Sequence, residues 1–240
     1  MHAAVAQQLI ALNREFYQTH AEAFSATRGR LQPGTVRMLA SAFATARILD
    51  LGCGNGGVAA HLAASGHQGS YVGLDFSEGL LQAARQRMAE YPAYSAEFRQ
   101  ADLSAAWAED VDGTFDVVLA MAVLHHIPSR ELQLAFLRQV CGVMNTRGQF
   151  VHSNWQFMRS PKLAARVQPW SAVGLDESQV DPGDYLLDWR SGGDGLRYVH
   201  QFSEEELAGL AAEAGFSVAE TFYSDGSTGD LSLYSVWDCQ

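Results

Sequence analysis

The chain has 240 residues, 48% hydrophobic and 18% charged, which suits one full globular core, and we expect a single domain over residues 1–240. Its formal net charge of −11 argues against a protein that grips nucleic acid over its whole surface, and leaves only a local basic site for that role. No apolar run approaches the ~20 residues that a bilayer span requires, so no membrane segment is expected.

The N-terminal part of the chain is expected to be helical. Apolar residues recur at helical spacings over residues 5–24, and a second helical segment is predicted over residues 35–44. We interpret residues 1–34 as a helical lid. The first residues carry no basic cluster followed by an apolar core, so we expect no secretory signal and a cytoplasmic location.

Strands and helices alternate along the middle of the chain. Short apolar runs predict strands, and amphipathic patterns with plausible capping residues predict helices. The strands are expected at residues 47–51, 70–75, 97–101, 115–120 and 149–153, and the helices at residues 77–88 and 130–143. This alternation is typical of a parallel, doubly wound sheet.

The pattern changes in the last third of the chain. Residues 155–199 show no regular period and are too long for an ordinary connection, so we interpret them as a substrate-facing insertion. A capping sequence then opens a helix over 203–214, and the turn-rich residues 224–230 join strands at 216–222 and 231–237 into a hairpin. The predicted fold class is α/β: a doubly wound, mostly parallel seven-stranded sheet that ends in an antiparallel hairpin.

The cysteines and cations limit the chemistry that the chain can use. Cys53, Cys141 and Cys239 are too few and too dispersed to predict a disulfide framework or a zinc site, and we expect no metal. Lys162 is the only lysine, so anion recognition would depend on the forked donors of arginine.

A glycine-rich loop follows the first predicted strand. Its sequence places Asp50 before Gly52, Gly54 and Gly56, in the pattern Asp-x-Gly-x-Gly-x-Gly. Glycine lets the backbone turn sharply and leaves room for a ligand against bare main chain. The spacing differs from the Gly-x-Gly-x-x-Gly of dinucleotide-binding turns, and a loop beside Asp50 suits a cation better than a phosphate.

Two further carboxylates follow predicted strands. Asp75 ends the second strand, where it can accept both hydroxyls of a ribose, and Asp102 follows the third. Ligands in doubly wound sheets bind at the carboxyl ends of the strands, so these residues and the glycine loop have one common explanation.

The set resembles the motifs of class I S-adenosylmethionine-dependent methyltransferases. The resemblance implies a methyltransferase that binds S-adenosyl-L-methionine, with Asp102 accepting from the adenine amino group and Leu103 and Phe76 lining the ring. It also implies that the backbone near Ala120 and Met121 faces the methionine moiety. An NAD-dependent oxidoreductase on the same fold, disfavoured by the glycine spacing, and a non-catalytic cofactor-binding module are the alternatives.

Shorter segments resemble the tRNA wobble-uridine carboxymethyl methyltransferases. They are the lid from Tyr17 to Arg28, Gly183-Asp184 with Trp189, and Arg197-Tyr198-Val-His200. The resemblance places Tyr17 and Arg28 at the cofactor, and implies a small partner subunit if the acceptor is a modified tRNA uridine. Because the net charge of −11 opposes binding of a polyanion, a small-molecule acceptor is the other interpretation, and O and N acceptors both stay open.

Several residues are candidates for the acceptor site. A carboxylate acceptor needs an arginine to hold one oxygen while the other attacks, and Arg190 and Arg197 are candidates, with Tyr198 and His200 completing the pocket. His125 and His126 follow a buried strand, and either could act as a base if the acceptor were a hydroxyl or an amine. Ordinary structural roles are the alternative for each of them.

Overall fold

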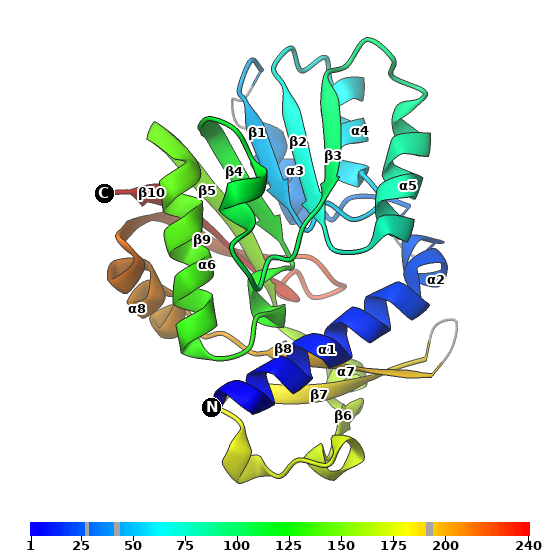
Figure 1. The fold of residues 1–240 in the computed structure, drawn as a ribbon, viewed down its shortest axis with the longest axis vertical. Coiled ribbons are helices and arrows are strands. Elements are labelled where there is room, and N and C mark those ends of the chain that lie inside the picture. Colours follow the sequence, from blue (N-terminus) through cyan, green and yellow to red (C-terminus); the bar gives the residue numbers. More distant parts are fainter. Residues whose placement is uncertain (27–28, 41–43, 191–193) are drawn as a thin grey trace.

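A seven-stranded sheet forms the centre of the molecule (Figure 1). The structure is a computed structural model and describes residues 1–26, 29–40, 44–190 and 194–240. The strand order is β3-β2-β1-β4-β5-β10-β9, and only β10 runs against the others. The strands are β1 (Ile48–Leu51), β2 (Tyr71–Asp75), β3 (Ala96–Gln100), β4 (Phe115–Met121), β5 (Met144–Trp155), β9 (Phe216–Ser224) and β10 (Ser232–Cys239). The predicted fold class is confirmed.

Helices cover both faces of this sheet, each face with its own buried apolar cluster. One face carries α3 (Pro33–Ala40), α4 (Gly57–Ala64) and α5 (Glu78–Met88), and the other carries α6 (Arg130–Val143) and α8 (Glu204–Ala214). Strands β1 and β4 are apolar almost throughout, because both of their faces are buried.

Local signals explain where these helices begin and end. The hydroxyls of Ser77, Ser129 and Ser203 accept from the backbone N–H of the third residue onward, which caps α5, α6 and α8. Gly215 ends α8 in the left-handed conformation with φ 85°. The ends of these helices are therefore specified by local sequence.

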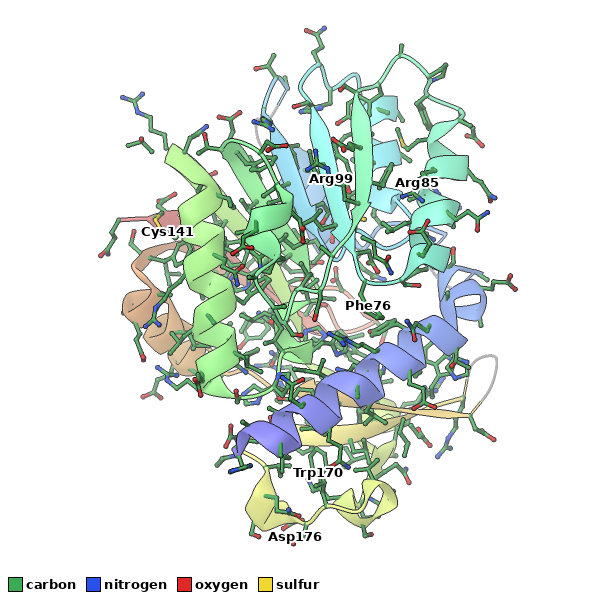
Figure 2. All side chains as sticks on the ribbon, viewed as in Figure 1. Phe76, Arg85, Arg99, Cys141, Trp170 and Asp176 are labelled. Carbon is green, nitrogen blue, oxygen red and sulfur yellow. A yellow bond between two sulfur atoms is a disulfide. The ribbon has the colours of Figure 1, made fainter. Side chains whose placement is uncertain are left out.

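A second, smaller sheet lies beyond one end of the large sheet, next to the N-terminal helix α1 (Ala3–Thr19) (Figure 1). It is antiparallel and contains β6 (Val167–Gln168), β7 (Asp184–Trp189) and β8 (Gly195–His200). We call α1 and these three strands the cap. Val5 and Leu9 of α1 pack with Trp170, which lies beside α1 in Figure 2, and with the buried Tyr198 of β8.

The cap shows that residues 155–199 form strands although their sequence has no regular period. Its strands are short and carry polar residues that are buried, such as Asp184 and Arg197, so they lack the alternation of an ordinary amphipathic strand. The N-terminal helix is also interrupted: α1 ends at Thr19, and α2 (Ala21–Ala26) follows. The described residues also contain short helical elements, namely α7 (Pro161–Ala164), η1 (Trp107–Asp110), η2 (Leu124–His126), η3 (Phe157–Arg159), η4 (Trp170–Val173) and η5 (Glu177–Gln179).

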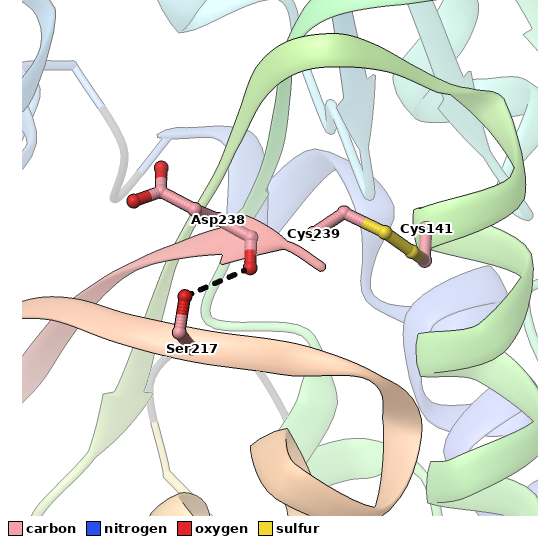
Figure 3. Close-up of a disulfide and its surroundings, with 4 residues drawn as sticks. All are labelled: Cys141, Ser217, Asp238 and Cys239. Carbon is pink, nitrogen blue, oxygen red and sulfur yellow. Dashed lines mark hydrogen bonds between the residues drawn. A yellow bond between two sulfur atoms is a disulfide. The ribbon is translucent and has the colours of Figure 1, made fainter.

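One disulfide joins α6 to the last strand (Figure 3). Cys141 and Cys239 lie 98 positions apart in the chain, and their Cα atoms are 5.7 Å apart. Beside it, the Ser217 hydroxyl donates to the Asp238 carbonyl at 3.5 Å. The dispersed cysteines therefore do form one bridge, because the sheet brings the end of β10 beside α6. Cys53 is buried and outside this bridge.

The described residues contain neither a membrane-spanning helix nor a cluster of metal-binding side chains. No helix in this part of the chain has the length and apolar character needed to cross a bilayer. The same residues contain no group of three or more His, Cys, Asp and Glu side chains that could hold a metal ion.

Candidate active site

A cavity of about 460 Å³ lies at the carboxyl ends of the parallel strands, and residues of α1 form part of its wall. The loops after β1 to β4 meet at this edge because the strands run in parallel. Twelve of the residues predicted from the sequence line it: Tyr17, Asp50, Gly52, Gly54, Asp75, Phe76, Asp102, Leu103, Met121, His125, His126 and Arg197. Segments far apart in the sequence thus contribute to one site.

The glycine loop presents bare backbone to this cavity. Gly54 has φ +54°, and a Cβ built there would meet no atom within 4 Å, so a side chain would extend into open space. Gly56, at φ +73°, does not line the cavity, and a Cβ on it would lie 2.9 Å from the Ala84 Cβ. The structure thus places Gly56 outside the cavity lining, and its lack of a side chain lets α4 approach α5.

Asp75 is held in a fixed orientation at the end of β2. One carboxylate oxygen accepts from the Gly54 N–H and the other from the Ser77 N–H, both at 2.9 Å. Desolvation by burial raises the pKa of Asp75, although these backbone donors oppose the rise. Each oxygen has a further lone pair, so the group can also accept from two adjacent hydroxyls of a ribose.

Asp50 lies under the glycine loop and is 2% exposed. The Tyr71 hydroxyl donates to it at 2.5 Å. Burial raises the pKa of Asp50 to about 7, with the Tyr71 hydrogen bond acting against the rise. A cation bound beside Asp50 would favour its ionised form, which fits the ammonium group of the expected cofactor.

Asp102 already has a cationic partner. Arg14 of α1 forms an ion pair with one of its oxygens, while the Ser104 N–H and hydroxyl donate to the other at 3.1 and 2.6 Å. Burial raises the pKa of Asp102, but these bonds together outweigh it and hold the pKa below its usual value. The Arg14 guanidinium also lies 5.0 Å from the centroid of the Phe76 ring, which faces α1 in Figure 2. Arg14, which the sequence did not single out, therefore stands where adenine is expected.

His125 and His126 lie on the turn after β4, with ring centroids 4.4 Å apart. Nδ1 of His125 accepts from the Trp155 N–H at 3.2 Å. Nδ1 of His126 lies 3.0 Å from the Tyr198 carbonyl oxygen, and its Nε2 lies 2.8 Å from the Tyr17 hydroxyl. His126 thus connects the large sheet to both parts of the cap.

Arg197 of β8 brings a buried cation to the cavity. The side chain is 4% exposed, and its Cζ lies 4.8 Å from the Trp155 ring and 5.4 Å from each of the Phe16 and Trp189 rings. Such contacts favour the cation and restrict the plane of the guanidinium.

Three candidate acceptor residues lie away from the cavity. Arg190 is exposed and pairs with Asp188. Tyr198 donates to Asp184 at 2.7 Å, and His200 lies 2.7 Å from the same carboxylate. Alternate residues of a strand point to opposite faces, so Tyr198 and His200 cannot share the cavity with Arg197. The structure thus gives these residues packing and ion-pair roles.

The remaining predicted cofactor residues are Ala120, which does not line the cavity, and Arg28. Ala120 is fully buried in the apolar core beneath β4, one position before Met121, which does line the cavity. Arg28 lies outside the described residues.

Other lining residues were missed because their signals are long-range. The Asn13 side chain accepts from the Tyr198 N–H at 2.8 Å and donates to its carbonyl at 3.1 Å, which docks α1 on β8. Asp225, at φ 72°, accepts from the Gly34 N–H at 2.9 Å and from the Tyr234 hydroxyl at 2.7 Å. For Asn13, the sequence offered one signal: a polar residue on the apolar side of the predicted helix indicates a buried hydrogen-bond partner.

Comparison with known proteins identifies the family. A family model described as "Methyltransferase domain" matches residues 48–148. A protein of Encephalitozoon cuniculi whose name provisionally assigns it to the methyltransferases is 30% identical over 226 residues, which cover 92% of each chain. The 27-O-demethylrifamycin SV methyltransferase of Amycolatopsis mediterranei is 32% identical over 186 residues, 70% of this chain and 64% of that protein.

Solved structures share the fold. The magnesium protoporphyrin IX methyltransferase of Synechocystis PCC 6803, with bound S-adenosylhomocysteine, has a TM-score of 0.66 at 20% identity and covers 95% of this chain and 97% of its own. An S-adenosylmethionine-dependent methyltransferase of Methanosarcina mazei has a TM-score of 0.65 at 20% identity, with 88% and 98% covered. The family sets the oxidoreductase alternative aside. The chain belongs to the class I S-adenosylmethionine-dependent methyltransferases, and S-adenosyl-L-methionine is its cofactor.

Proposed function

We propose that the protein methylates an oxygen atom of a small acceptor that carries a carboxylate, and that Arg197 anchors this carboxylate. The observation that carries the proposal is a buried guanidinium that lines the cavity. Arginine binds a carboxylate through two parallel N–H donors, and the three surrounding rings favour one orientation of those donors.

Other residues that line the cavity suit the cofactor. Asp75 would accept from the ribose hydroxyls, Phe76 and Leu103 would line the adenine, and Asp50 would face the ammonium group. When bound, S-adenosyl-L-methionine supplies an electrophilic methyl group on a sulfonium. The protein contributes proximity and orientation, since a nucleophile held in line with that methyl group loses little further entropy in the reaction.

A small acceptor fits the charge of the protein better than tRNA does. The net charge of −11 opposes a polyanion, and α1 forms part of the wall of the cavity. A modified tRNA uridine with a carboxymethyl group would offer Arg197 the same carboxylate, so it is the second candidate, and it would need a partner subunit. A cytoplasmic location stays a prediction.

The test follows a labelled methyl group. The full chain is incubated with methyl-labelled cofactor and with acidic, neutral and basic small-molecule pools from a cell extract, or with total RNA. We expect label in the acidic pool. Label in RNA would favour the tRNA candidate, and label only in the neutral or basic pool would contradict a carboxylate anchor.

Substitutions then test the anchor itself. Arg197→Met should reduce labelling of the acidic pool at least about tenfold, because a charged hydrogen bond is worth roughly 1.5–3 kcal/mol. Arg190→Met is the matched control, since Arg190 lies on the same hairpin but is exposed and away from the cavity. Binding of S-adenosylhomocysteine should be the same for both variants, which confirms that each one folds.

A further inference from the structure

We propose that the acceptor also carries hydroxyl groups that are not methylated, and that Asp225 and Ser153 bind them in a subsite of the cavity. The inference rests on the proposed function, because it describes another part of the same acceptor. It depends on a buried carboxylate and a buried hydroxyl that line the cavity with hydrogen-bonding capacity still unused.

The subsite lies on the other side of β4 from the cofactor carboxylates. Asp50 and Asp75 belong to β1 and β2, and Asp102 follows β3. These three strands lie on one side of β4 in the strand order. Ser153 belongs to β5, and Asp225 directly follows β9, which both lie on the other side. This placement assigns the subsite to the acceptor and not to the cofactor.

The same part of the sheet reaches the proposed carboxylate anchor. Ser153 lies opposite Tyr234 in the antiparallel pairing of β5 with β10. Trp155 and Ser232 form the next pair on the same face, because side chains alternate along a strand. The Trp155 ring lies 4.8 Å from Cζ of Arg197. Successive pairs on one face are about 7 Å apart along a strand, so one small acceptor can reach both Arg197 and the subsite.

Asp225 is a buried carboxylate that two donors hold in place. It is 4% exposed, and its oxygens accept from the Gly34 N–H at 2.9 Å and from the Tyr234 hydroxyl at 2.7 Å. Burial raises the pKa of Tyr234, and the hydrogen bond and charge of Asp225 add to the rise while Thr35 opposes it. The Tyr234 hydroxyl therefore keeps its hydrogen and donates it. Each oxygen of Asp225 has a further lone pair with which it can accept from a ligand.

Ser153 supplies a complementary donor. It is 4% exposed, and its hydroxyl oxygen accepts from the Ala122 N–H at 3.1 Å. Within the described part of the chain, no group accepts the hydrogen of this hydroxyl. A ligand that fills the cavity and excludes water must then supply the acceptor atom, because a buried donor without a partner is unfavourable.

Hydroxyl groups satisfy both residues of the subsite. A hydroxyl can donate its hydrogen to Asp225, and its oxygen can accept from Ser153. An ammonium group could donate to Asp225, but it has no lone pair with which to accept from Ser153. A carboxylate would be repelled by Asp225. The subsite therefore selects the hydroxylated part of the acceptor and directs the carboxylate of the acceptor toward Arg197.

The chain offers variants that keep the local structure. Asp225 has φ 72°, which Asn also adopts readily, so Asp225→Asn preserves the turn. In Ser153→Ala, the Ala122 N–H keeps its bond to the carbonyl of residue 153 at 3.1 Å. Ser235→Ala is the matched control for this change. Ser235 is 2% exposed and accepts from Trp237 Nε1 at 2.7 Å, but it does not line the cavity.

The first experiment counts the free hydroxyl groups of the labelled acidic product by mass spectrometry. Acetic anhydride in pyridine acetylates hydroxyl and amino groups, whereas dinitrofluorobenzene in bicarbonate reacts with amino groups. We expect more acetyl groups than dinitrophenyl groups on the product. Equal numbers would mean that no free hydroxyl exists, which would overturn the inference and leave the proposed function intact. No label in the acidic pool would contradict the proposed function, and the inference with it.

The second experiment measures initial rates with the acidic fraction at a series of dilutions. Asp225→Asn should raise KM for the acceptor about tenfold, the usual effect of weakening a hydrogen bond to a charged group, and Ser153→Ala about fivefold. Both variants should bind S-adenosylhomocysteine as the wild type does. Ser235→Ala should lower the melting temperature and leave KM unchanged.

Two outcomes of these measurements would overturn the inference. The first is an unchanged KM in both subsite variants. The second is weaker binding of S-adenosylhomocysteine by Asp225→Asn, which would place Asp225 at the cofactor. If Asp225→Asn does not fold, the KM of Ser153→Ala decides alone, because that variant keeps every backbone hydrogen bond of Ala122 and residue 153.

Discussion

The cofactor edge of the large sheet and the cap are built in different ways. At the edge, the ligand groups are backbone N–H groups and carboxylates placed by consecutive strand ends, as Gly54 and Asp75 show. In the cap, side chains from distant segments meet, such as Asn13 of α1 and the backbone of Tyr198 in β8, which are 185 positions apart. The first region follows from local sequence pattern, and the second depends on tertiary contacts.

The largest effect is expected at the cofactor edge. Asp75→Ala removes an acceptor for two ribose hydroxyls, and charged hydrogen bonds of this kind are worth about 4 kcal/mol together, or roughly 1000-fold in affinity. Calorimetric titration with S-adenosylhomocysteine measures it. Asp116→Ala is the control, because Asp116 also accepts from a backbone N–H, that of Arg47 at 2.7 Å, but does not line the cavity. Equal losses in the two variants would contradict a specific role of Asp75.

Most of the fold could be predicted because its signals are local. Serine caps and Gly215 mark the ends of helices. Strands that are buried on both faces appear in the sequence as apolar runs, so every strand of the large sheet was predicted. The strands of the cap were not, because β7 and β8 bury charged residues that a hydrophobic pattern excludes. The Cys141–Cys239 disulfide was missed because only the folded sheet brings these residues together.

The site divides along the same line. Gly54 and Asp102 line the cavity because the carboxyl ends of parallel strands meet at one edge of the sheet, and this does not depend on the cap. For β8, the sequence identified the motif that contains Arg197, Tyr198 and His200, but without a predicted strand it could not separate the face with Arg197 from the face with the other two. Arg14 was missed because its partner, Asp102, is distant in the sequence.

The next largest effect belongs to the cap, at His200. Its Nδ1 and Nε2 lie 2.7 and 2.8 Å from Asp184 and Glu206. Burial lowers the pKa of His200, but the hydrogen bonds and charges of the two carboxylates together outweigh it and raise the pKa to about 9. In the unfolded chain an imidazole has a pKa of about 6.5. The folded state therefore binds the proton more tightly.

The sign of the pH dependence follows. The contribution of His200 to the free energy of unfolding, about 3 kcal/mol, is complete below about pH 6.5 and is lost as the pH rises through about 9. Urea unfolding at a series of pH values should show this alkaline decline, and His200→Gln should flatten it. His152 of β5 is the counterpart in the large sheet, because burial lowers its pKa to about 3. His152→Leu should change the pH dependence of the free energy of unfolding only on the acid side. There the unfolded chain binds a proton at this position and the folded chain does not.

A smaller effect separates two glycines of the same loop. Alanine at Gly54 or Gly56 costs about 1 kcal/mol for its positive φ. At Gly56 it also meets Ala84 at 2.9 Å, which adds about 1–3 kcal/mol of overpacking. We therefore expect Gly56→Ala to lower the melting temperature more and Gly54→Ala to weaken binding of S-adenosylhomocysteine more. The same ranking in both measurements would show that the two positions have one role.

The smallest effect tests whether the cap competes with the cofactor. Arg14 forms an ion pair with Asp102, and its Cζ lies 5.0 Å from the centroid of the Phe76 ring. This distance leaves no room for adenine between the guanidinium and that ring. Cofactor binding must then break an ion pair whose side chains are 38% and 34% exposed. Such a pair is worth about 0.2–1 kcal/mol, so Arg14→Met should tighten binding of S-adenosylhomocysteine about two- to fivefold. Added salt screens the pair, so it should tighten binding to the wild type and not to the variant. Arg37→Met is the control, since Arg37 pairs with Glu220 and lies 3.8 Å from the Phe222 ring, away from the cavity. Weaker binding by Arg14→Met would mean that Arg14 holds the adenine, and that the cap completes the cofactor site instead of opposing it.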